Sequence, residues 1–442
     1  MDLRAIASRF AIALGKRISL FLIHVIAWIT LASFELLLVS AIMQLGLALP
    51  MAYYFHRATV IGLPANLLVI PLMEILMPAA VAAVAVGFIS LTVAKLPTLV
   101  AGVSLLLITS TVHWLGALRA ADTRVATPAL VTILFACTVL GIAMLLARQS
   151  APLAATGLTL LSIAAFWIAV ISPKPQFNDG VMEVTAVDVG QGNSIFVVSP
   201  EGRTLLVDAG GAPLWMQSGL DIGENVVSPY LWSRGIQRID AVAITHTHAD
   251  HMGGMRAILA NFRPRELWLG VDSPSPALQA IIQPARSAGV IIIPHKAGDT
   301  LNFGNVNIRV LAPSLDPATQ SWRRNDDSLA MKMSYGNTSA LLEGDAERQT
   351  EKQIAQERPQ ADLLKVGHHG SATSTIPELL QAVHPRYAVI SVGVRNVHGH
   401  PRKEVLDRLR EAGVATYRTD LDGAVTFLLN GRTVSPKLPA LH

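Results

Sequence analysis

The first 172 residues constrain the fold most strongly, because they form long apolar runs separated by short basic or proline-containing breaks. A helix needs about 20 apolar residues to cross a bilayer, and several consecutive runs reach that length. A cleaved signal peptide followed by buried helices would leave most of these runs unexplained. The sequence therefore predicts a polytopic membrane domain over residues 1–172. Its transmembrane helices are expected at 19–45, 64–92, 98–118, 127–147 and 152–172.

Basic residues near the ends of the apolar runs predict how the chain is oriented. Cytoplasmic loops carry an excess of lysine and arginine, and this rule favours an inside N-terminus. With an odd number of spans, everything after residue 172 then lies on the outer side of the cytoplasmic membrane. The two faces carry Arg4, Arg9, Lys16, Arg17, Lys95 and Arg148 on one side, against Arg57, Arg119, Arg124 and Lys174 on the other.

Composition limits the kinds of partner and of metal site. The net charge of +4 is too small to choose between nucleic acid and anionic lipid as the partner. The single cysteine, Cys137, lies in an apolar run, which excludes disulfides within the chain and cysteine-based zinc fingers. Any metal must therefore be held by histidine, aspartate or glutamate.

Beyond Ser172-Pro173-Lys174-Pro175 the pattern changes to short strands separated by turn residues. Met182 to Val189, Ile195 to Val198 and Thr204 to Val207 predict a β-meander. Helical patterns alternate with further strands after it, so we expect a two-sheet core flanked by helices over residues 178–442. The helices are expected at 224–234, 252–261, 276–288, 346–357, 376–383 and 402–412. Further strands include 241–244, 290–293, 307–311, 329–334, 339–343, 362–366 and 387–391.

Residues 246–251 read His-Thr-His-Ala-Asp-His directly after one of these apolar strands. Imidazole and carboxylate groups are costly to bury without partners, and a metal supplies a partner. His246 and His248 stand two apart, while Asp250 and His251 are adjacent, so one turn can aim two pairs of ligands at two nearby points. The run predicts a pair of metal ions roughly 3.5–4 Å apart, which generates hydroxide at neutral pH and clamps both oxygens of a displacement reaction.

Three later segments place further candidate ligands at strand ends. Asp345 follows an apolar strand and a glycine, a good position for a carboxylate that bridges two cations. His368 and His369 follow another strand, and His400 lies in the later segment His-Gly-His-Pro. Each alone is compatible with a capped turn, but together with the first run they predict one metal centre.

The phrases THTHADHMGG, LLVDAGG and LLEGD, with the later histidines, resemble the metallo-β-lactamase superfamily. That resemblance implies a four-layered αββα sandwich with a metal pair at the sheet edge. It assigns Asp208 as the strand-end aspartate that orients the site and Asp345 as the bridging carboxylate. The remaining metal ligands that it implies are His246, His248, Asp250, His251 and His400, and His369 is a further candidate ligand.

A narrower resemblance covers nearly the whole chain. VDVGQGNSIFVVSPEGRTLLVDAGG, LKVGHHGSATST and NVHGHP, together with YYFHRATVIGLPANLLVIPL in the apolar part, are similar to the ComEC-type competence proteins. In that family a membrane channel domain precedes a metallo-β-lactamase-like domain, and transforming DNA crosses the cytoplasmic membrane. The resemblance implies that the second domain degrades the DNA strand that does not enter.

The chain departs from the family pattern in three places. The usual third histidine, between the main run and Asp345, has no clear counterpart, and Asn325-Asp326-Asp327-Ser328 stands in that interval. Asn193 occupies a position after VGQG where relatives commonly have an acidic residue. The chain also begins partway through the family's membrane domain, so hydrolysis is the firmer expectation and transport the weaker one.

The expected reaction is hydrolysis of DNA phosphodiesters with two divalent ions, Zn²⁺ or Mn²⁺. Asp250 would orient the attacking hydroxide, while His369 or His368 steadies the phosphate or protonates the leaving oxygen. Lys365 and Ser371 would hold a neighbouring phosphate, although a solvated charge at a strand end is an equally good interpretation of Lys365.

Two other classes of function compete with this one. The chain could be a membrane-tethered hydrolase of small esters or lactams without a transport role. It could also be a channel or binding module whose hydrolase domain has lost a metal. The expected partners are DNA and membrane lipid, with a homo-oligomer or a separately encoded half completing the channel.

Overall fold

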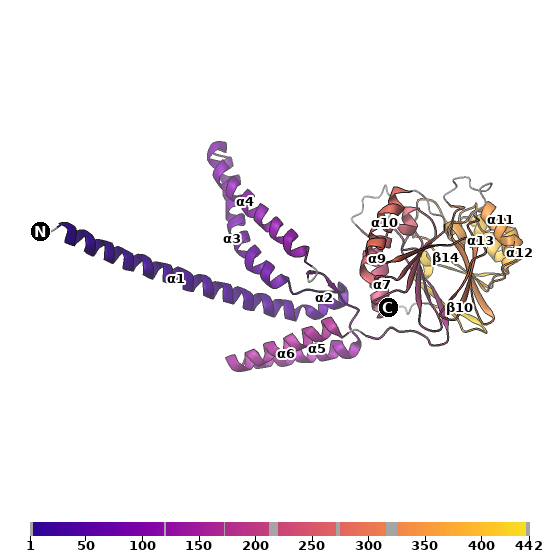
Figure 1. Ribbon diagram of the computed structural model, residues 1–442, viewed down its shortest axis with the longest axis horizontal. Helices are drawn as coiled ribbons and strands as arrows, with labels where there is room; N and C mark the ends of the chain where they lie inside the picture. The colour runs from indigo at the N-terminus through magenta and orange to yellow at the C-terminus, as the bar shows by residue number, and fades with distance from the viewer. Residues whose placement is uncertain are drawn as a thin grey trace. The chain divides into compact units, whose positions relative to one another are not determined.

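The computed structural model describes residues 3–118, 121–171, 173–211, 220–270, 275–314 and 325–438, with side chains from residue 20 onward. The chain divides into two compact units, Met1–Pro173 and Lys174–His442 (Figure 1).

The first unit is helical. In its described part, five helices are long and apolar enough to cross a membrane, which confirms the predicted five spans. These candidate spans are Leu20–Gly46, Gly62–Gly87, Leu91–Gly116, Leu130–Ala147 and Ala151–Val170. The corresponding helices are α1 (Leu3–Gly46), α3 (Gly62–Gly87), α4 (Leu91–Gly116), α5 (Leu130–Ala147) and α6 (Ala151–Val170), and the short α2 (Ala48–Tyr54) follows α1. α3 packs against α4, and α5 against α6.

The boundary between the second and third spans differs from the prediction. α3 ends at Gly87 and α4 begins at Leu91, whereas the expected spans were 64–92 and 98–118. The backbone turns at Ser90, whose Oγ accepts a hydrogen bond from the N–H of Val93 as a helix N-cap. The residues before Ser90 are apolar, so no change of polarity marks this turn. Lys95, the basic residue between the two expected spans, lies inside α4, where a lysine near a helix end can extend toward the membrane surface.

The second unit contains two sheets. In the first, the strand order is β17-β16-β3-β4-β5-β6-β7-β8, and in the second it is β15-β14-β13-β12-β11-β10-β9. The first comprises β3 (Met182–Ala186), β4 (Ile195–Val198), β5 (Thr204–Val207), β6 (Ala241–Ile244), β7 (Glu266–Leu269), β8 (Ile291–Pro294), β16 (Val425–Leu429) and β17 (Val434–Lys437). The second comprises β9 (Thr300–Phe303), β10 (Val306–Ala312), β11 (Ala330–Tyr335), β12 (Thr338–Leu342), β13 (Leu363–Lys365), β14 (Tyr387–Ile390) and β15 (Ala415–Arg418). A separate two-stranded pair, β1 (Arg57–Ala58) and β2 (Thr123–Arg124), belongs to the helical unit.

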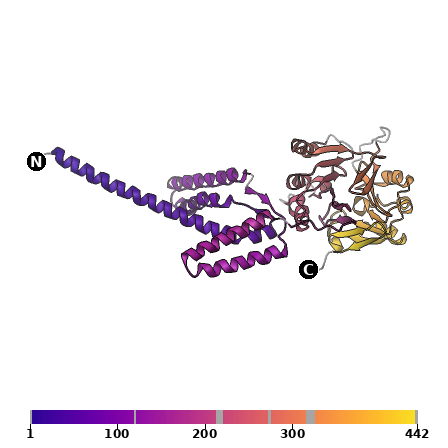
Figure 2. The ribbon, with the colours of Figure 1, turned by 60° about the horizontal axis from the view of Figure 1, so that its bottom comes forward.

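The buried side chains of the second unit form three layers of core. One cluster lies between the sheets and includes Val184 and Ile195 from one sheet with Leu342 from the other. Helices cover the outer face of each sheet (Figure 2). They are α7 (Ser228–Ser233), α9 (Met255–Phe262) and α10 (Pro276–Ser287) on the first sheet, and α11 (Arg348–Gln356), α12 (Pro377–Val383) and α13 (Lys403–Glu411) on the second. The predicted αββα sandwich is therefore confirmed.

The direction of the strands places the site. β5 and β6 are parallel neighbours in one sheet, and β12, β13 and β14 are parallel neighbours in the other. Ligands in folds of this kind bind beyond the carboxyl ends of parallel strands. The histidine run follows β6, and the later candidate residues follow β12, β13 and β14.

Candidate metal centre

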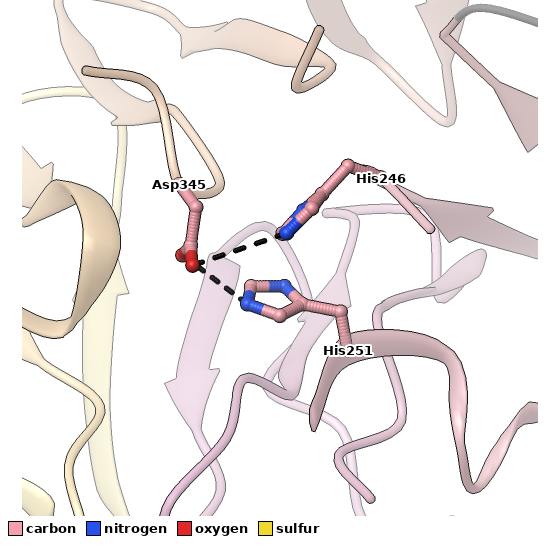
Figure 3. Close-up of side chains that lie close together, drawn as sticks. All are labelled: His246, His251 and Asp345. Carbon is pink, nitrogen blue, oxygen red and sulfur yellow. Dashed lines mark ion pairs between the residues drawn. The ribbon is translucent and has the colours of Figure 1, made fainter. Parts of the chain in front are cut away.

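His246 and His251 emerge from the carboxyl end of β6 and converge on Asp345, which follows β12 (Figure 3). His251 Nε2 lies 3.2 Å from Asp345 Oδ1, and His246 Nε2 lies 3.9 Å from Asp345 Oδ2. All three side chains are buried. Ligand atoms from the three lie within 4.8 Å of one another, a spacing that one metal ion can bridge.

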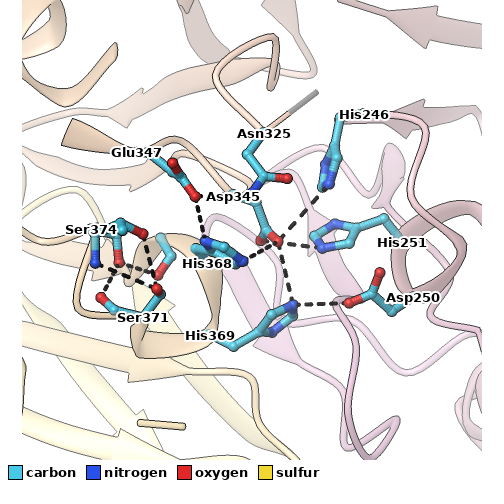
Figure 4. Close-up of polar contacts among 12 residues, drawn as sticks. His246, Asp250, His251, Asn325, Asp345, Glu347, His368, His369, Ser371 and Ser374 are labelled. Atoms are coloured by element: carbon cyan, nitrogen blue, oxygen red, sulfur yellow. Dashed lines mark hydrogen bonds and ion pairs between the residues drawn. The ribbon is translucent and has the colours of Figure 1, made fainter. Parts of the chain in front are cut away.

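A second group of three shares His251 with the first. Its other members are Asp250, on the short helix α8 (Ala249–Met252), and His369, which follows β13. His369 Nε2 lies 3.3 Å from Asp250 Oδ2 and 3.6 Å from Asp345 Oδ2 (Figure 4). The two groups therefore share His251, and His369 of the second group also lies near Asp345 of the first.

The imidazole nitrogens that face this centre are buried without aligned partners. The Nε2 atoms of His246, His251 and His369 make no hydrogen bond with any described residue, although each lies near a carboxylate oxygen. Buried polar atoms are nearly always satisfied in native proteins. Imidazole nitrogens and carboxylate oxygens suit Zn²⁺ and also Mn²⁺, so this donor set fits a divalent cation.

Electrostatics keep His246, Asp345 and Asp250 in states that bind metal. The charges of Asp345 and Asp208 instead outweigh burial at His251 and raise the pKa of that imidazole well above its ordinary value. Burial, with the charge of His251, lowers the pKa of His246 to about 3, so its imidazole is neutral at pH 7. Burial alone would raise the pKa of Asp345, but the charges of His251 and His369 outweigh it and hold that pKa well below its ordinary value. The pKa of Asp250 is likewise low, because the imidazole of His369 beside it and the charge of His251 outweigh burial.

Asp208, at the end of β5, fixes the ring of His251. His251 Nδ1 lies 2.7 Å from Asp208 Oδ2, an arrangement in which Nδ1 donates and Nε2 faces the centre. The same carboxylate accepts hydrogen bonds from the backbone N–H of Thr245 at 2.8 Å and from Asn193 Nδ2 at 2.8 Å. The asparagine that departs from the family pattern therefore supports this aspartate.

The interval that lacks the third histidine contributes Ser328 to the site. Its Oγ lies 3.4 Å from His246 Nδ1 and accepts a hydrogen bond from the backbone N–H of Asp345 at 3.0 Å. Gly344, with φ +56°, makes this approach possible, because a Cβ there would lie 3.0 Å from both Ser328 and Thr245. Sequence reasoning marked the interval and missed this role of Ser328.

His368 and His369 lie on a turn with left-handed backbone, at φ 45° and 55°. Such conformations cost non-glycine residues about 1–3 kcal/mol each and cluster at functional sites. His369 Nδ1 bonds to the carbonyl of Ser391 at 2.8 Å, which directs its Nε2 toward Asp250. His368 is more exposed, and its Nδ1 lies 3.0 Å from Glu347 Oε1.

Two buried glutamates accept hydrogen bonds from the backbone at the start of this turn and from the segment that follows it. Glu343 Oε1 accepts a hydrogen bond from the backbone N–H of Gly367 at 3.0 Å. Glu351, on α11, accepts hydrogen bonds from the backbone N–H groups of Thr375 and Ile376. Burial raises the pKa of Glu351 to about 7 and, with the charge of Glu351, raises that of Glu343 well above its ordinary value. Sequence reasoning missed both, because nothing local marks a glutamate as buried.

Comparison with known proteins agrees with this architecture. The model of the competence protein family matches residues 6–150, and that of the metallo-β-lactamase superfamily matches residues 187–394. The first match lies in the helical unit and the second in the unit with the two sheets. The second match includes the predicted site residues from Asp208 to His369 and ends before His400.

Among curated proteins, the chain is 33% identical over 420 residues to ComE operon protein 3 of Bacillus subtilis, covering 90% of this chain and 52% of that protein. It is 30% identical over 247 residues to competence protein ComA of Neisseria gonorrhoeae, covering 55% of this chain and 32% of that one. The chain thus spans about half the length of the first relative and about a third of the second. Among solved structures, the metallo-β-lactamase fold protein YhfI of Bacillus subtilis is 15% identical, with a TM-score of 0.37, covering 58% of this chain and all of that one.

Lys365, the last residue of β13, is buried, whereas the sequence predicted a side chain that holds a phosphate or a solvated charge. Its side chain is 1% exposed, and its Nζ donates to the carbonyl of Val366 at 2.9 Å. It is therefore neither a solvated charge nor accessible to a phosphate at the surface. Burial lowers the pKa of Lys365, while the neighbouring Asp345 and Glu343 oppose this shift. Ser371 is also buried, and its Oγ bonds to Thr373 Oγ1 within the same loop.

His248 and His400 lie beside the two ligand groups. Of the described residues, the groups contain neither of them. The ring of His248 packs edge-on against that of His246, with 4.6 Å between centroids. The ring of His400 lies 5.8 Å from that of His368, and burial with the charge of His368 lowers the pKa of His400 to about 4.

Proposed function

We propose that this chain is a multi-pass membrane protein of DNA uptake whose second domain, residues 178–442, hydrolyses DNA phosphodiesters with two divalent metal ions. The observation that carries the proposal is that two ligand groups share His251, with the Nε2 atoms of three buried histidines lacking a hydrogen-bond partner among the described residues. The competence-family domain supports the choice of DNA over other phosphodiesters.

The residues of the site divide the work of such a reaction. A divalent cation bound here supplies a hydroxide at neutral pH and polarises the phosphoryl oxygens. His246, His251, Asp345 and His369 are buried and hold their ring and carboxylate atoms inward, as metal ligands do. Asp250 is partly exposed, and its low pKa keeps it ionised. It can therefore accept a hydrogen bond from the attacking water.

His368 is the better placed of the two adjacent histidines to touch substrate. Its side chain is 24% exposed, compared with 2% for His369. Glu347 beside its Nδ1 orients the ring and leaves Nε2 toward the centre. We assign His369 as a ligand and His368 as the group that steadies the phosphate or protonates the leaving oxygen.

We further propose that residues 1–172 contribute to a DNA channel in the cytoplasmic membrane, with the hydrolase domain on the outer side. A second copy or a separately encoded membrane half would complete that channel. Lipid and DNA are the partners that this arrangement requires.

The test is a nuclease assay on the second unit, Lys174–His442, whose three core clusters draw on no residue before Phe177. We expect cleavage of labelled DNA that depends on added Mn²⁺ or Zn²⁺. Asp345→Asn should reduce the rate by at least about 100-fold, more than the loss usual for a group that only supports a ligand. The matched control is Asp179→Asn, an exposed aspartate before β3. Absence of cleavage across a metal titration would contradict the proposal.

One observation favours a second candidate. His248 and His400 lie outside the ligand groups, so the site as described offers fewer nitrogen ligands than the resemblance implies. A domain that binds one ion and guides DNA without cutting it would have this geometry. Binding of DNA without hydrolysis, and no turnover of nitrocefin or thioesters, would identify it.

A further inference from the structure

The segment Gly393–Lys403, which follows β14, is a cationic loop beside the metal centre. It contains Arg395, Arg402 and Lys403 and no acidic residue. Its backbone joins the histidine turn, because the N–H of Arg402 donates to the carbonyl of Gly370 at 2.8 Å. The proposed reaction uses none of these cations.

Two apolar side chains stand out from this loop. Val394 is 69% exposed and Val397 is 73% exposed. Single exposed valines are ordinary. Two of them within four residues, on either side of Arg395 and next to a candidate active site, form a small apolar surface beside positive charge.

The loop is held in this form by its own hydrogen bonds. Asn396 Nδ2 donates to the carbonyls of Gly393 at 3.1 Å and His400 at 2.7 Å, and Asn396 Oδ1 accepts from the backbone N–H of His400 at 3.0 Å. The N–H of Gly393 donates to Gln191 Oε1 at 3.2 Å, which ties the loop to the turn after β3. The exposure of the valines is therefore fixed by the fold, and a ligand would not have to order them.

A row of imidazole rings connects the loop to the centre. His398 and His400 are stacked, with 5.7 Å between ring centroids and 13° between their planes. His400 in turn lies 5.8 Å from His368. His398 is exposed, so the outermost ring of the row presents an aromatic surface to solvent.

Apolar and aromatic surface beside arginines is the combination that binds single-stranded nucleic acid. Bases stack on side-chain faces, and the backbone phosphates are attracted to the cations. A duplex keeps its bases stacked on each other and would use only the cations. Resting on the proposed function, we propose that the Gly393–Lys403 loop is a docking subsite for unpaired nucleotides next to the reacting phosphate. Val394, Val397 and His398 would contact bases, and Arg395 and Arg402 would contact phosphates.

The experiment measures binding separately from cleavage. The full-length chain in lipid nanodiscs is titrated into a fluorescein-labelled oligothymidylate in the presence of EDTA, and fluorescence anisotropy gives the Kd. The double variant Arg395→Gln with Val397→Ser should weaken binding by roughly tenfold or more, because it loses one apolar contact with a base and one contact with a phosphate. The same double variant should weaken binding to the corresponding duplex by a smaller factor than binding to the single strand.

The matched control changes one arginine and one exposed apolar residue at the end of the first sheet that lies away from the candidate metal centre. Arg432 lies in the β16–β17 turn beside Met182, and Ile291 is 62% exposed at the start of β8. Arg432→Gln with Ile291→Ser should leave the Kd within about twofold, as for surface changes away from a site. Thermal unfolding midpoints equal to that of the natural chain would show that the variants are folded.

Three outcomes would overturn this inference. One is no binding of oligothymidylate by the natural chain. Another is a double variant whose Kd equals that of the control. The third is an equal loss for single strand and duplex, which would reduce the loop to a nonspecific cationic patch. If the loop variant loses binding while no metal supports cleavage, the subsite stands and the proposed hydrolysis fails.

Discussion

The two halves of the candidate metal centre are held in place by different means. The half that follows β5 and β6 relies on one buried aspartate, because Asp208 accepts from His251, Thr245 and Asn193 at the same time. The half that follows β12 and β13 relies on a strained turn, with left-handed backbone at His368 and His369 and buried glutamates at its ends. The geometry of the first half should therefore depend on the acceptor oxygens of Asp208. The geometry of the second half should depend on the size and hydrogen bonds of the buried glutamates.

The largest effect is expected in the first half, from Asp208→Asn. The amide cannot offer the same two acceptor oxygens, so the ring of His251 loses its fixed orientation. Loss of such a partner typically costs about 10- to 100-fold in metal affinity, and we expect a loss in that range for Mn²⁺ measured by calorimetric titration.

Asp240→Asn is the matched control for that variant. Asp240 also accepts two hydrogen bonds, from the N–H and Oγ1 of Thr204, but at the opposite end of β6. If the Asp208→Asn and Asp240→Asn proteins bind Mn²⁺ equally tightly, Asp208 does not have the proposed role of orienting His251.

A smaller effect is expected in the second half, and it should depend on shape more than charge. Burial and the neighbouring Glu351 raise the pKa of Glu343 well above its ordinary value, so the fold favours the neutral carboxyl. Glutamine keeps the size and an acceptor for the N–H of Gly367, so Glu343→Gln should stay close to the natural protein in stability. Glu343→Ala leaves that N–H unpaired and should cost about 1–3 kcal/mol in free energy of unfolding.

Chemical denaturation of both variants, with metal chelated, measures the difference between them. Equal destabilisation by glutamine and alanine would show that Glu343 holds the turn through its charge, contrary to this account.

The smallest effect is a change in pH dependence from Glu351→Gln. Burial raises the pKa of Glu351 from 4.5 to about 7, so the folded protein holds a proton that the unfolded chain releases at lower pH. This group's contribution to stability is therefore full below about pH 4.5, falls as pH rises to about 7, and is constant above that.

In the Glu351→Gln variant, the fall in stability that this carboxyl causes between about pH 4.5 and about pH 7 should be absent. Unfolding midpoints of the second unit at about pH 5 and about pH 8, with metal chelated, test the prediction. The same decline in both proteins would contradict the buried, protonated state of Glu351.

Much of the fold could be predicted from local patterns. β4 and β5 lie where the meander was predicted, since the turns around Asn193 and Gly202 and the apolar runs between them are local signals. The expected helix at 224–234 is a π-helix, Gly223–Val227, followed by α7. The return of β16 to pair with β3 could not be predicted, because that pairing joins residues more than two hundred positions apart and depends on tertiary packing.

The candidate site shows the same limit. The run from His246 to His251 is compact in sequence, and the structure brings three of its members into the ligand groups. The burial of Lys365 was not predicted, because it depends on the position of β13 between β12 and β14 and on acidic neighbours such as Asp345 that follow another strand. The positions of His248 and His400 beside the groups depend on the path of two turns, which residue spacing does not determine.

The most direct test of the central claim is the number of metal ions that the second unit binds. Equilibrium dialysis against Mn²⁺ or Zn²⁺, with metal content read by mass spectrometry, measures the equivalents bound by Lys174–His442 and by its His369→Ala variant. The account predicts two equivalents for the natural sequence and about one for the variant, which retains the group of His246, His251 and Asp345. One equivalent or fewer in the natural sequence would contradict it.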